Sequence, residues 1–259
     1  MPCAARRKSK TGIYHIIVRG INRQEIFHDD QDRITYLKTL QRYALLFGLK
    51  VYAWCLMDNH VHLLVEEGAE DISITMKRIG VSYVHYYHWK YKTSGHFFEN
   101  RYKSEVVESK RYFLTVLRYI HQNPLKAGMV KHAVEWEWSN CRGYYENGAF
   151  PAGLLNSEPV LLMFAAESED GKIPFRQFNE VLNIDACMEF TEKNQFRLTD
   201  DEARKKIKKV LPSTEIAHVK SMAKKQRDHF LREVKMVPGV SHRQAARILG
   251  VSVTLVTRA

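Results

Sequence analysis

Two apolar stretches separated by a short polar turn constrain the fold of this chain most strongly. Residues 50–57 and 61–66 are rich in the β-branched, aromatic and other apolar residues that are typical of strands. Asp58 and Asn59 stand between the stretches, and both residue types are favoured in turns. The sequence therefore predicts two neighbouring strands joined by a tight connection.

The segments around this strand pair alternate between strand and helix patterns. Residues 12–20 and 96–109 are predicted as further strands, and helical periodicity covers residues 29–48, 71–92 and 110–128. We expect Pro124 to stop the last of these helices. The order strand–helix–strand–strand–helix–strand–helix predicts an α+β fold, with a ferredoxin-like antiparallel sheet and packed helices.

Composition divides the chain into three expected parts. Residues 147–172 contain the loop-forming stretches NGAFPAG and ESEDGK, which indicate a boundary zone. We expect one domain over residues 1–150, a helical extension or linker over 151–198, and a basic all-α domain over 199–259.

The charge of the chain lies at its two ends. The net charge of +11 and the pI near 9.4 indicate a polyanionic partner, most often nucleic acid. The first ten residues hold four of the basic side chains and no acidic one, residues 199–259 hold 14 Lys and Arg against 6 Asp and Glu, and the remainder is close to neutral. No apolar run approaches the roughly 18–20 residues that span a membrane, and the four scattered cysteines favour a reducing, cytoplasmic location.

His60 and His62 are the first candidate site residues. Residues i and i+2 of a strand point to one face, so the two imidazoles lie side by side while Val61 faces the other way. Two neutral imidazoles at this spacing form a natural pair of metal ligands. The alternative is a pair of core or edge histidines that are hydrogen-bonded to their neighbours.

Tyr119 and Asn123 supply a second pair, at i and i+4 on one face of the predicted helix 110–128. An apolar stripe beside them is expected to pack on the sheet, and it consists of Phe113, Val116, Leu117 and Ile120. A carboxamide oxygen and two imidazoles can hold a hard divalent ion with open positions for phosphate oxygens. The alternative is an ordinary helix with a tyrosine on its flank. Tyr112 lies seven residues before Tyr119 and is the chief rival to Tyr119 for a role in this site. His121 is expected to have no catalytic role.

Five motifs together resemble the single-tyrosine HUH transposases, and more closely the REP-associated tyrosine transposases of the insertion-sequence-200-like family. The resemblance covers about residues 11–145 and is carried by YHIIVRGINRQ, WCLMDNHVHLLV, GHFFENRYKSEVVES, RYIHQNPLKAGMV and WEWSNCRGYY.

This resemblance implies an HUH nuclease core with an assigned site. His60 and His62 match the metal-binding histidines, Asn123 matches the third ligand, and Tyr119 matches the nucleophile. The implied cofactor is Mg²⁺ or Mn²⁺. The implied activity is sequence- or hairpin-guided cleavage and transfer of single-stranded DNA through a 5′-phosphotyrosine intermediate, catalysed by a metal-dependent endonuclease and strand transferase.

The DNA itself is expected to contact basic and polar residues outside this group. The resemblance implies single-stranded DNA with a hairpin as the partner, and the candidate contacts are Arg19, Asn22, Arg23, Arg101 and Lys103. A solvated basic face is the alternative for each of them.

The last residues predict a separate contact with duplex DNA. SHRQAARILGVSVTLVTRA reads as a helix from Ser241, a turn at Gly250 and a second helix that Ser252 opens, which is typical of a helix-turn-helix. Ser252 and Thr254 would lie at the start of the recognition helix. A plain αα-hairpin is the alternative.

Two other functions stay open at this point. One is a DNA-binding regulator with an inactive nuclease body, and the other is a metal-dependent phosphohydrolase of small nucleotides, which the two basic ends do not favour. The sequence leaves the oligomeric state open, and a homodimer is among the assemblies that it allows.

Overall fold

The computed structural model divides the chain into two compact units, Met1–Phe190 and Thr191–Ala259. Each unit has its own buried apolar core. The described residues are 6–146, 148–165, 170–182, 185, 187–188, 198, 200–210, 219 and 222–259, without the side chains of Asn22, Asp200 and Asp201. Among the helices of these residues, none has the length and apolar character needed to cross a bilayer.

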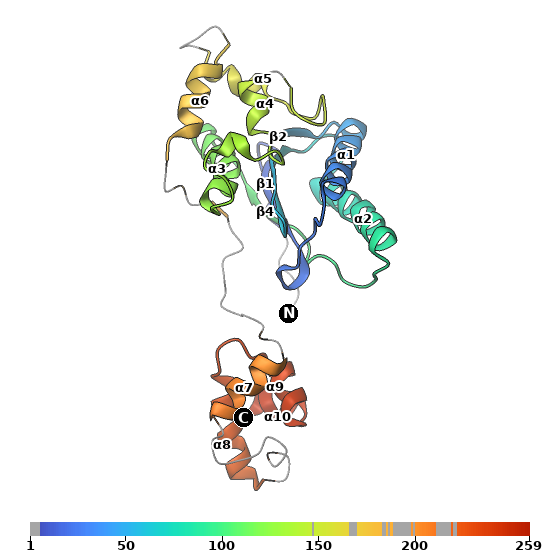
Figure 1. Ribbon diagram of the computed structural model, residues 1–259, viewed down its shortest axis with the longest axis vertical. Helices are drawn as coiled ribbons and strands as arrows, with labels where there is room; N and C mark the ends of the chain where they lie inside the picture. Colours follow the sequence, from blue (N-terminus) through green and yellow to red (C-terminus); the bar gives the residue numbers. More distant parts are fainter. Residues whose placement is uncertain are drawn as a thin grey trace. The chain divides into compact units, whose positions relative to one another are not determined.

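The first unit is built on a four-stranded antiparallel sheet (Figure 1). In spatial order its strands are β2 (Lys50–Leu56), β3 (His60–Glu66), β1 (Ile13–Arg19) and β4 (Lys103–Val106). β1 is a central strand, which pairs with β3 along one side and with β4 along the other. The sheet and the element order confirm the predicted α+β class with an antiparallel sheet and packed helices.

Helices α1 (Asp30–Phe47) and α2 (Ile72–Tyr91) cover one face of the sheet (Figure 1). The core on this face joins side chains of both helices to the alternating inward residues of the strands, among them Leu37, Leu40, Met76, Ile79, Ile16, Val18, Val61, Leu63 and Val65. Since Val61 and its i+2 neighbours point into this core, the histidines between them point to the opposite face.

The ends of α1 follow from local chemistry. Asp29 accepts a hydrogen bond from the backbone N–H of Asp32 at 3.0 Å, and the Asp32 carboxylate accepts from the Asp29 N–H, which forms a capping box. Gly48 ends the helix with φ +69°, a left-handed conformation that favours glycine.

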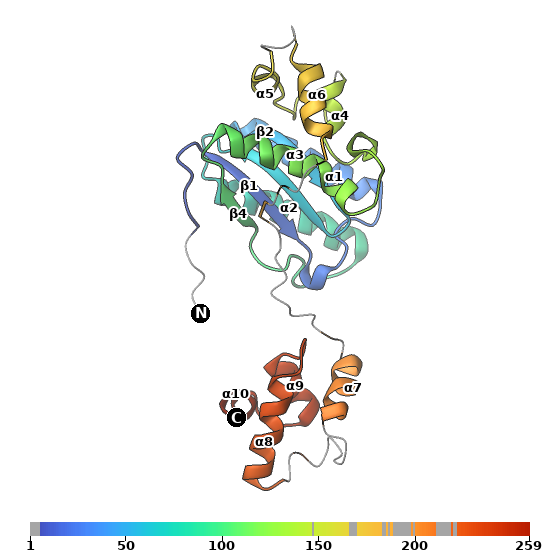
Figure 2. The same cartoon turned by 90° about the vertical axis from the view of Figure 1, so that its left-hand side faces the viewer.

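Helix α3 (Lys110–Lys126) covers the other face, and Figure 2 shows it crossing in front of the strands. The predicted apolar stripe of α3 is buried against Tyr52, Ala53, Cys55 and Leu64 of the sheet. Three further helices pack around α3: α4 (Cys141–Tyr145), α5 (Glu158–Leu161) and α6 (Lys172–Glu180). Val160 of α5 and Phe175 of α6, which lie in the predicted helical extension over residues 151–198, are part of this second core.

The predicted strand over residues 96–109 is shorter in the structure. Only Lys103–Val106 forms a strand, and Phe98 makes one isolated bridge to Gly20. Phe97 is buried in the α1/α2 core and Phe98 packs against that core, so this part of the chain leaves the sheet to bury its two aromatic rings.

The expectation that Pro124 stops the helix is wrong. α3 continues through Pro124 to Lys126, and the backbone N–H of Ala127 still donates to the carbonyl of Asn123 at 2.9 Å. Pro124 stands in the last turn, where its missing N–H removes one helical hydrogen bond without interrupting a longer ladder. The helix therefore holds Asn123 in regular geometry.

Residues 136–145 seal the outer edge of β2, which is the side of this strand that faces away from β3. The Asn140 carboxamide accepts from the Trp54 N–H at 2.8 Å and donates to the Tyr52 carbonyl at 3.0 Å. The indole N–H of Trp136 donates to the Leu56 carbonyl at 3.0 Å. These groups satisfy backbone atoms that an edge strand otherwise exposes.

The second unit is helical in its described part. Helices α7 (Asp200–Val210), α8 (Lys224–Lys235), α9 (His242–Leu249) and α10 (Val253–Arg258) enclose a small apolar core. Ser241 caps α9, Gly250 ends it with φ +65°, and Ser252 caps α10 by accepting from the Leu255 N–H at 3.2 Å. The helix ends expected from the sequence agree with these positions.

Replacing Asn140 tests the edge seal. Asn140→Ala leaves the buried Trp54 N–H without its acceptor, while the Tyr52 carbonyl keeps the Tyr144 hydroxyl as a donor, so the free energy of unfolding in urea should fall by about 1–3 kcal/mol. Asn140→Asp keeps the acceptor for Trp54 and serves as the matched variant. Unchanged stability of Asn140→Ala would contradict the seal.

Candidate active site

His60 and His62 stand on β3 and point to the sheet face that α3 covers. Their ring centroids are 4.9 Å apart. His62 is buried, with 2% of its surface exposed, whereas His60 is half-buried at the end of the strand. The predicted juxtaposition of the two imidazoles is present in the structure.

Tyr119 and Asn123 reach the same place from α3. The ring centroid of Tyr119 is 5.7 Å from that of His62, and Asn123 Nδ2 is 3.3 Å from His62 Nε2. The Asn123 side chain also hydrogen-bonds to His60. The structure thus brings together His60, His62, Tyr119 and Asn123, which the sequence analysis had selected separately.

Burial keeps both imidazoles neutral. It lowers the pKa of His60 to about 4, with a further lowering by the positive charge of Arg19. Burial also lowers the pKa of His62 well below its usual value, and the neighbouring His60, His15 and Arg19 act in the same direction. Unprotonated imidazoles retain the lone pairs with which they bind metal ions.

The tautomer of His60 follows from its neighbours. The Asn59 amide donates through Nδ2 to the Arg23 carbonyl at 3.2 Å, so its oxygen is the atom 2.6 Å from His60 Nδ1. His60 therefore carries its proton on Nδ1 and presents the lone pair of Nε2.

These donors are of the kinds that bind divalent metal ions. Two neutral imidazoles and one carboxamide are suitable ligands, and three protein ligands leave open positions for phosphate oxygens. In the described residues, no group of three His, Cys, Asp or Glu side chains has the arrangement of a metal site.

Two further residues of α3, the rival Tyr112 and His121, have hydrogen-bond partners outside the histidine pair. The Tyr112 hydroxyl donates to Glu105 Oε2 at 2.5 Å, and burial, with this carboxylate beside it, raises the Tyr112 pKa. His121 is fully buried between Asn179 and Asn140, at 3.0 and 3.3 Å. In the described contacts neither side chain touches His60 or His62.

The candidate DNA-binding residues divide between the two faces of the sheet. Arg19 stands opposite His60 in the β1–β3 register, and Lys103 and His62 both stand opposite Ile17, which places Lys103 on the histidine face. Arg23 is exposed beside Asn59, while the side chain of Asn22 lies outside the described atoms.

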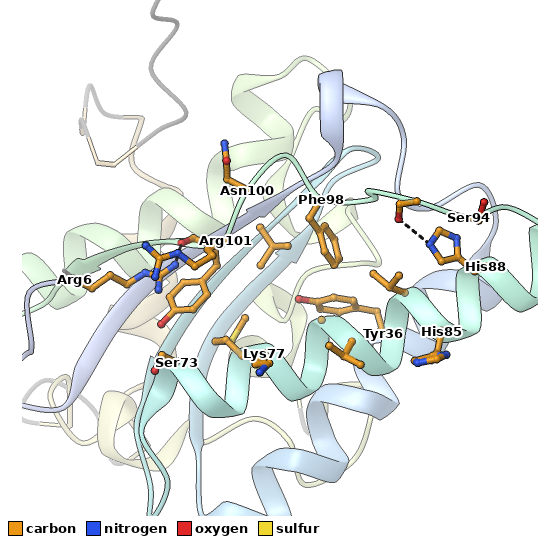
Figure 3. A pocket seen from close by; sticks show the side chains of 17 residues that line it. Arg6, Tyr36, Ser73, Lys77, His85, His88, Ser94, Phe98, Asn100 and Arg101 are labelled. Atoms are coloured by element: carbon orange, nitrogen blue, oxygen red, sulfur yellow. Dashed lines mark hydrogen bonds between the residues drawn. The ribbon is translucent and has the colours of Figure 1, made fainter. Parts of the chain in front are cut away.

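Arg101 lies on the other side of the sheet, at a cavity of about 820 Å³ between α2 and the segment that leads to β4 (Figure 3). Arg6 and Lys77 add positive charge to its lining. Among the residues that the structure describes, the hydroxyl groups of Tyr36 and Tyr102 in the lining have no hydrogen-bond partner. Periodicity could not reveal this cavity, because its residues come from five separate segments of the chain.

Ser252 and Thr254 belong to the second unit and are exposed there. The Ser252 hydroxyl caps α10, so it has a structural partner in the Leu255 N–H. Thr254 follows on the first turn of the same helix.

His15 is the residue that the sequence analysis missed. It lies fully buried on β1, and its Nε2 is 3.2 Å from Nδ1 of His62. Ile17 stands opposite His62, and His15 lies two residues before Ile17 on the same strand, so both point to the histidine face. This i, i+2 spacing was the signal that could have identified His15.

The sequence was compared with protein families and curated proteins, and the structure with solved structures. Residues 8–123 match the family described as "Transposase IS200 like". No curated protein matches the sequence.

Among solved structures, a REP-associated tyrosine transposase bound to a REP hairpin is similar with a TM-score of 0.50 and 20% identity, over 58% of this chain and 89% of that one. A candidate transposase from Deinococcus radiodurans R1, also 20% identical, covers 46% of this chain and 96% of its own with a TM-score of 0.28, too low to support an argument. The first likeness supports the fold.

The family match spans the sheet, the histidine pair and the tyrosine helix up to Asn123, and the fold agrees with it. The resemblance noted from the motifs is confirmed: residues 8–123 match the IS200-like transposase family, and the fold is similar to that of a REP-associated tyrosine transposase.

Proposed function

We propose that this transposase-family protein cleaves and transfers single-stranded DNA with Tyr119 as the nucleophile. The observation that carries the proposal is the contact of Tyr119 and Asn123 on α3 with His62 on β3. A hydroxyl nucleophile, two neutral imidazoles and a carboxamide at one point form a site for phosphoryl transfer.

The reaction exchanges one phosphodiester bond for another. The Tyr119 oxygen attacks the phosphorus atom, the bond from phosphorus to the 3′ oxygen breaks, and the strand leaves with a free 3′-hydroxyl. The proton lost by Tyr119 balances the proton gained by that 3′ oxygen. Because the 5′-phosphotyrosine retains the energy of the broken bond, a second 3′-hydroxyl can reverse the reaction without ATP.

His60, His62 and Asn123 would hold the divalent cation. A bound Mg²⁺ or Mn²⁺ supplies charge that polarises the phosphate and favours the transition state. As a ligand Asn123 would present its carboxamide oxygen, which would require the amide that donates to His62 to rotate.

Cationic side chains of the chain itself complete the phosphate site. Arg19 lies beside His60, and the Lys126 ammonium lies 5.0 Å from the centre of the Tyr119 ring. Both can contact the oxygens of the scissile phosphate. Arg101 and the aromatic lining of the cavity in Figure 3 would hold DNA that flanks the site on the other face of the sheet.

The resemblance and the solved relative's REP hairpin support a hairpin-bearing single strand as the DNA partner. The second unit would bind duplex DNA through a helix-turn-helix formed by α9 and α10. The capped helices on either side of the turn at Gly250 support this function, which is to anchor the protein on duplex DNA.

One observation favours the second candidate, a DNA-binding regulator with an inactive nuclease body. Tyr119 is only 2% exposed, so its hydroxyl must become accessible before it can attack DNA. Formation of a covalent protein–DNA adduct separates the enzyme from the regulator.

Removing the nucleophilic oxygen tests the first candidate. Tyr119→Phe keeps the ring that packs beside His62, so the fold and DNA binding should persist while cleavage falls by about 10³-fold or more. The measurement is the denaturant-stable adduct with single-stranded oligonucleotides in gel electrophoresis. Tyr112→Phe is the matched control and should retain the adduct; loss in this control alone would identify Tyr112 as the nucleophile.

Removing the ion or its ligands tests the metal site. EDTA should abolish cleavage reversibly, and Mg²⁺ or Mn²⁺ should restore it, while His60→Ala and His62→Ala should stay inactive because they delete ligands. Asn123→Ala should need a higher metal concentration for half-maximal cleavage. Undiminished cleavage by metal-stripped protein in EDTA would return the histidines to a structural role.

Deleting the second unit tests the division of functions. A protein ending at Phe190 keeps both cores of the first unit and should still cleave short single strands. Its duplex affinity should fall, and the slope of log affinity against log salt should flatten by roughly one for each lost phosphate contact.

Point changes in the tail refine this test. Thr254→Ala and Ser252→Ala should alter the preference for DNA sequence. Ser252→Ala also removes the cap of α10. Variants of Lys224 and Lys225 should instead lower the affinity for all DNA sequences alike. Equal affinity and equal slope for the full and shortened proteins would leave the tail with a packing role only.

A further inference from the structure

His15 is a fully buried imidazole on β1 that the proposed reaction does not use. Its ring lies nearly parallel to that of His62, with centroids 5.4 Å apart and planes inclined by 22°. Nε2 of His15 and Nδ1 of His62 are 3.2 Å apart, which is a hydrogen-bond distance between two ring nitrogens.

Only one of these two nitrogens can carry the shared proton. A neutral imidazole has one N–H and one lone pair, so protonation of one nitrogen fixes the character of the other. If His62 carries its proton on Nδ1, it donates to His15 and turns the lone pair of Nε2 toward Asn123. If it carries the proton on Nε2, that nitrogen is an N–H and cannot bind a cation.

Asn123 favours the first arrangement. Its Nδ2 is the atom 3.3 Å from His62 Nε2, and an amide N–H needs a lone pair as its acceptor. His60 shows the same arrangement with a different neighbour, because Asn59 accepts from its Nδ1 and leaves Nε2 available.

His15 carries a polar atom that packing alone does not explain. Its Nδ1 is buried and has no hydrogen-bond partner in the described structure. Its neighbours on β1, Ile16 and Ile17, are apolar and fully buried, and an apolar side chain in place of His15 would remove the unsatisfied atom. What the imidazole adds is an acceptor at Nε2.

We propose that His15 is a positioning residue that holds His62 in the tautomer with a proton on Nδ1 and a lone pair on Nε2. The inference rests on the proposed metal site for its purpose, although the tautomer exists without a metal ion. Ligand imidazoles are commonly oriented by an acceptor at the nitrogen that faces away from the ion.

The tautomer can be observed directly. Long-range ¹H–¹⁵N spectra of the full chain with ¹⁵N-labelled histidine, recorded in EDTA, distinguish protonated from unprotonated ring nitrogens. We expect His62 to show a protonated Nδ1 and an unprotonated Nε2. A proton on Nε2 of His62 would overturn the proposal, whether or not the protein cleaves DNA.

Two variants test the consequence for the ion. His15→Leu removes the acceptor, and Mn²⁺ affinity measured by electron paramagnetic resonance should fall by about 10- to 100-fold. His15→Gln offers a carboxamide oxygen as an acceptor and should restore part of that affinity. Cleavage by His15→Leu should rise again at saturating Mn²⁺, because the Tyr119 hydroxyl is untouched.

His121→Leu is the matched control for loss of a buried imidazole. His121 is also fully buried and neutral, and its partners are Asn179 and Asn140 instead of a metal ligand. This variant should lose stability and keep its Mn²⁺ affinity. Equal Mn²⁺ affinity of folded His15→Leu and the unchanged protein would overturn the proposal.

The outcomes separate this inference from the proposed function. If the unchanged protein binds no Mn²⁺, the metal site fails, while the His62 tautomer still decides the role of His15. If His15→Leu does not fold, the tautomer of His62 in His15→Gln takes its place: a protonated Nδ1 supports the proposal and a protonated Nε2 refutes it.

Discussion

The burial of His62 between the sheet and α3 is the constraint on which the site depends. Both ring nitrogens of this buried imidazole have partners: His15 comes from β1 and Asn123 comes from α3. The histidine strand, its neighbour and the tyrosine helix are therefore tied at one residue. A shift in the β1–β3 register or in the docking of α3 would separate the ligands from the nucleophile.

The docking of α3 is in turn secured from its far side. His121 and Gln122 both hydrogen-bond to Asn179 of α6, and His121 also reaches Asn140, whose carboxamide holds the edge of β2. The segment beyond residue 150 thus helps to fix the helix that carries Tyr119.

The sequence was informative where the signal was local. The i, i+2 spacing of His60 and His62 and the i, i+4 spacing of Tyr119 and Asn123 placed each pair on one face, and the motif resemblance joined the pairs. His15 and Asn140 were missed as partners because their hydrogen bonds span 47 and 88 residues, which no periodicity contains. Pro124 was misjudged because proline is tolerated in a last helical turn, a boundary that only the structure defines.

A first unit with little net charge can still bind a DNA phosphate, because the charges next to the site determine how strongly the phosphate is held. Apolar surroundings keep His60 and His62 unprotonated, so the imidazoles contribute lone pairs and no net charge. Positive charge at the site comes instead from Arg19 and Lys126, which lie beside His60 and Tyr119. In a desolvated site a few fixed charges act more strongly than a larger charge spread over a wet surface. Of these two residues Arg19 is half-buried and Lys126 is exposed, so the burial around Tyr119 would strengthen the interaction of Arg19 with a bound phosphate more than that of Lys126.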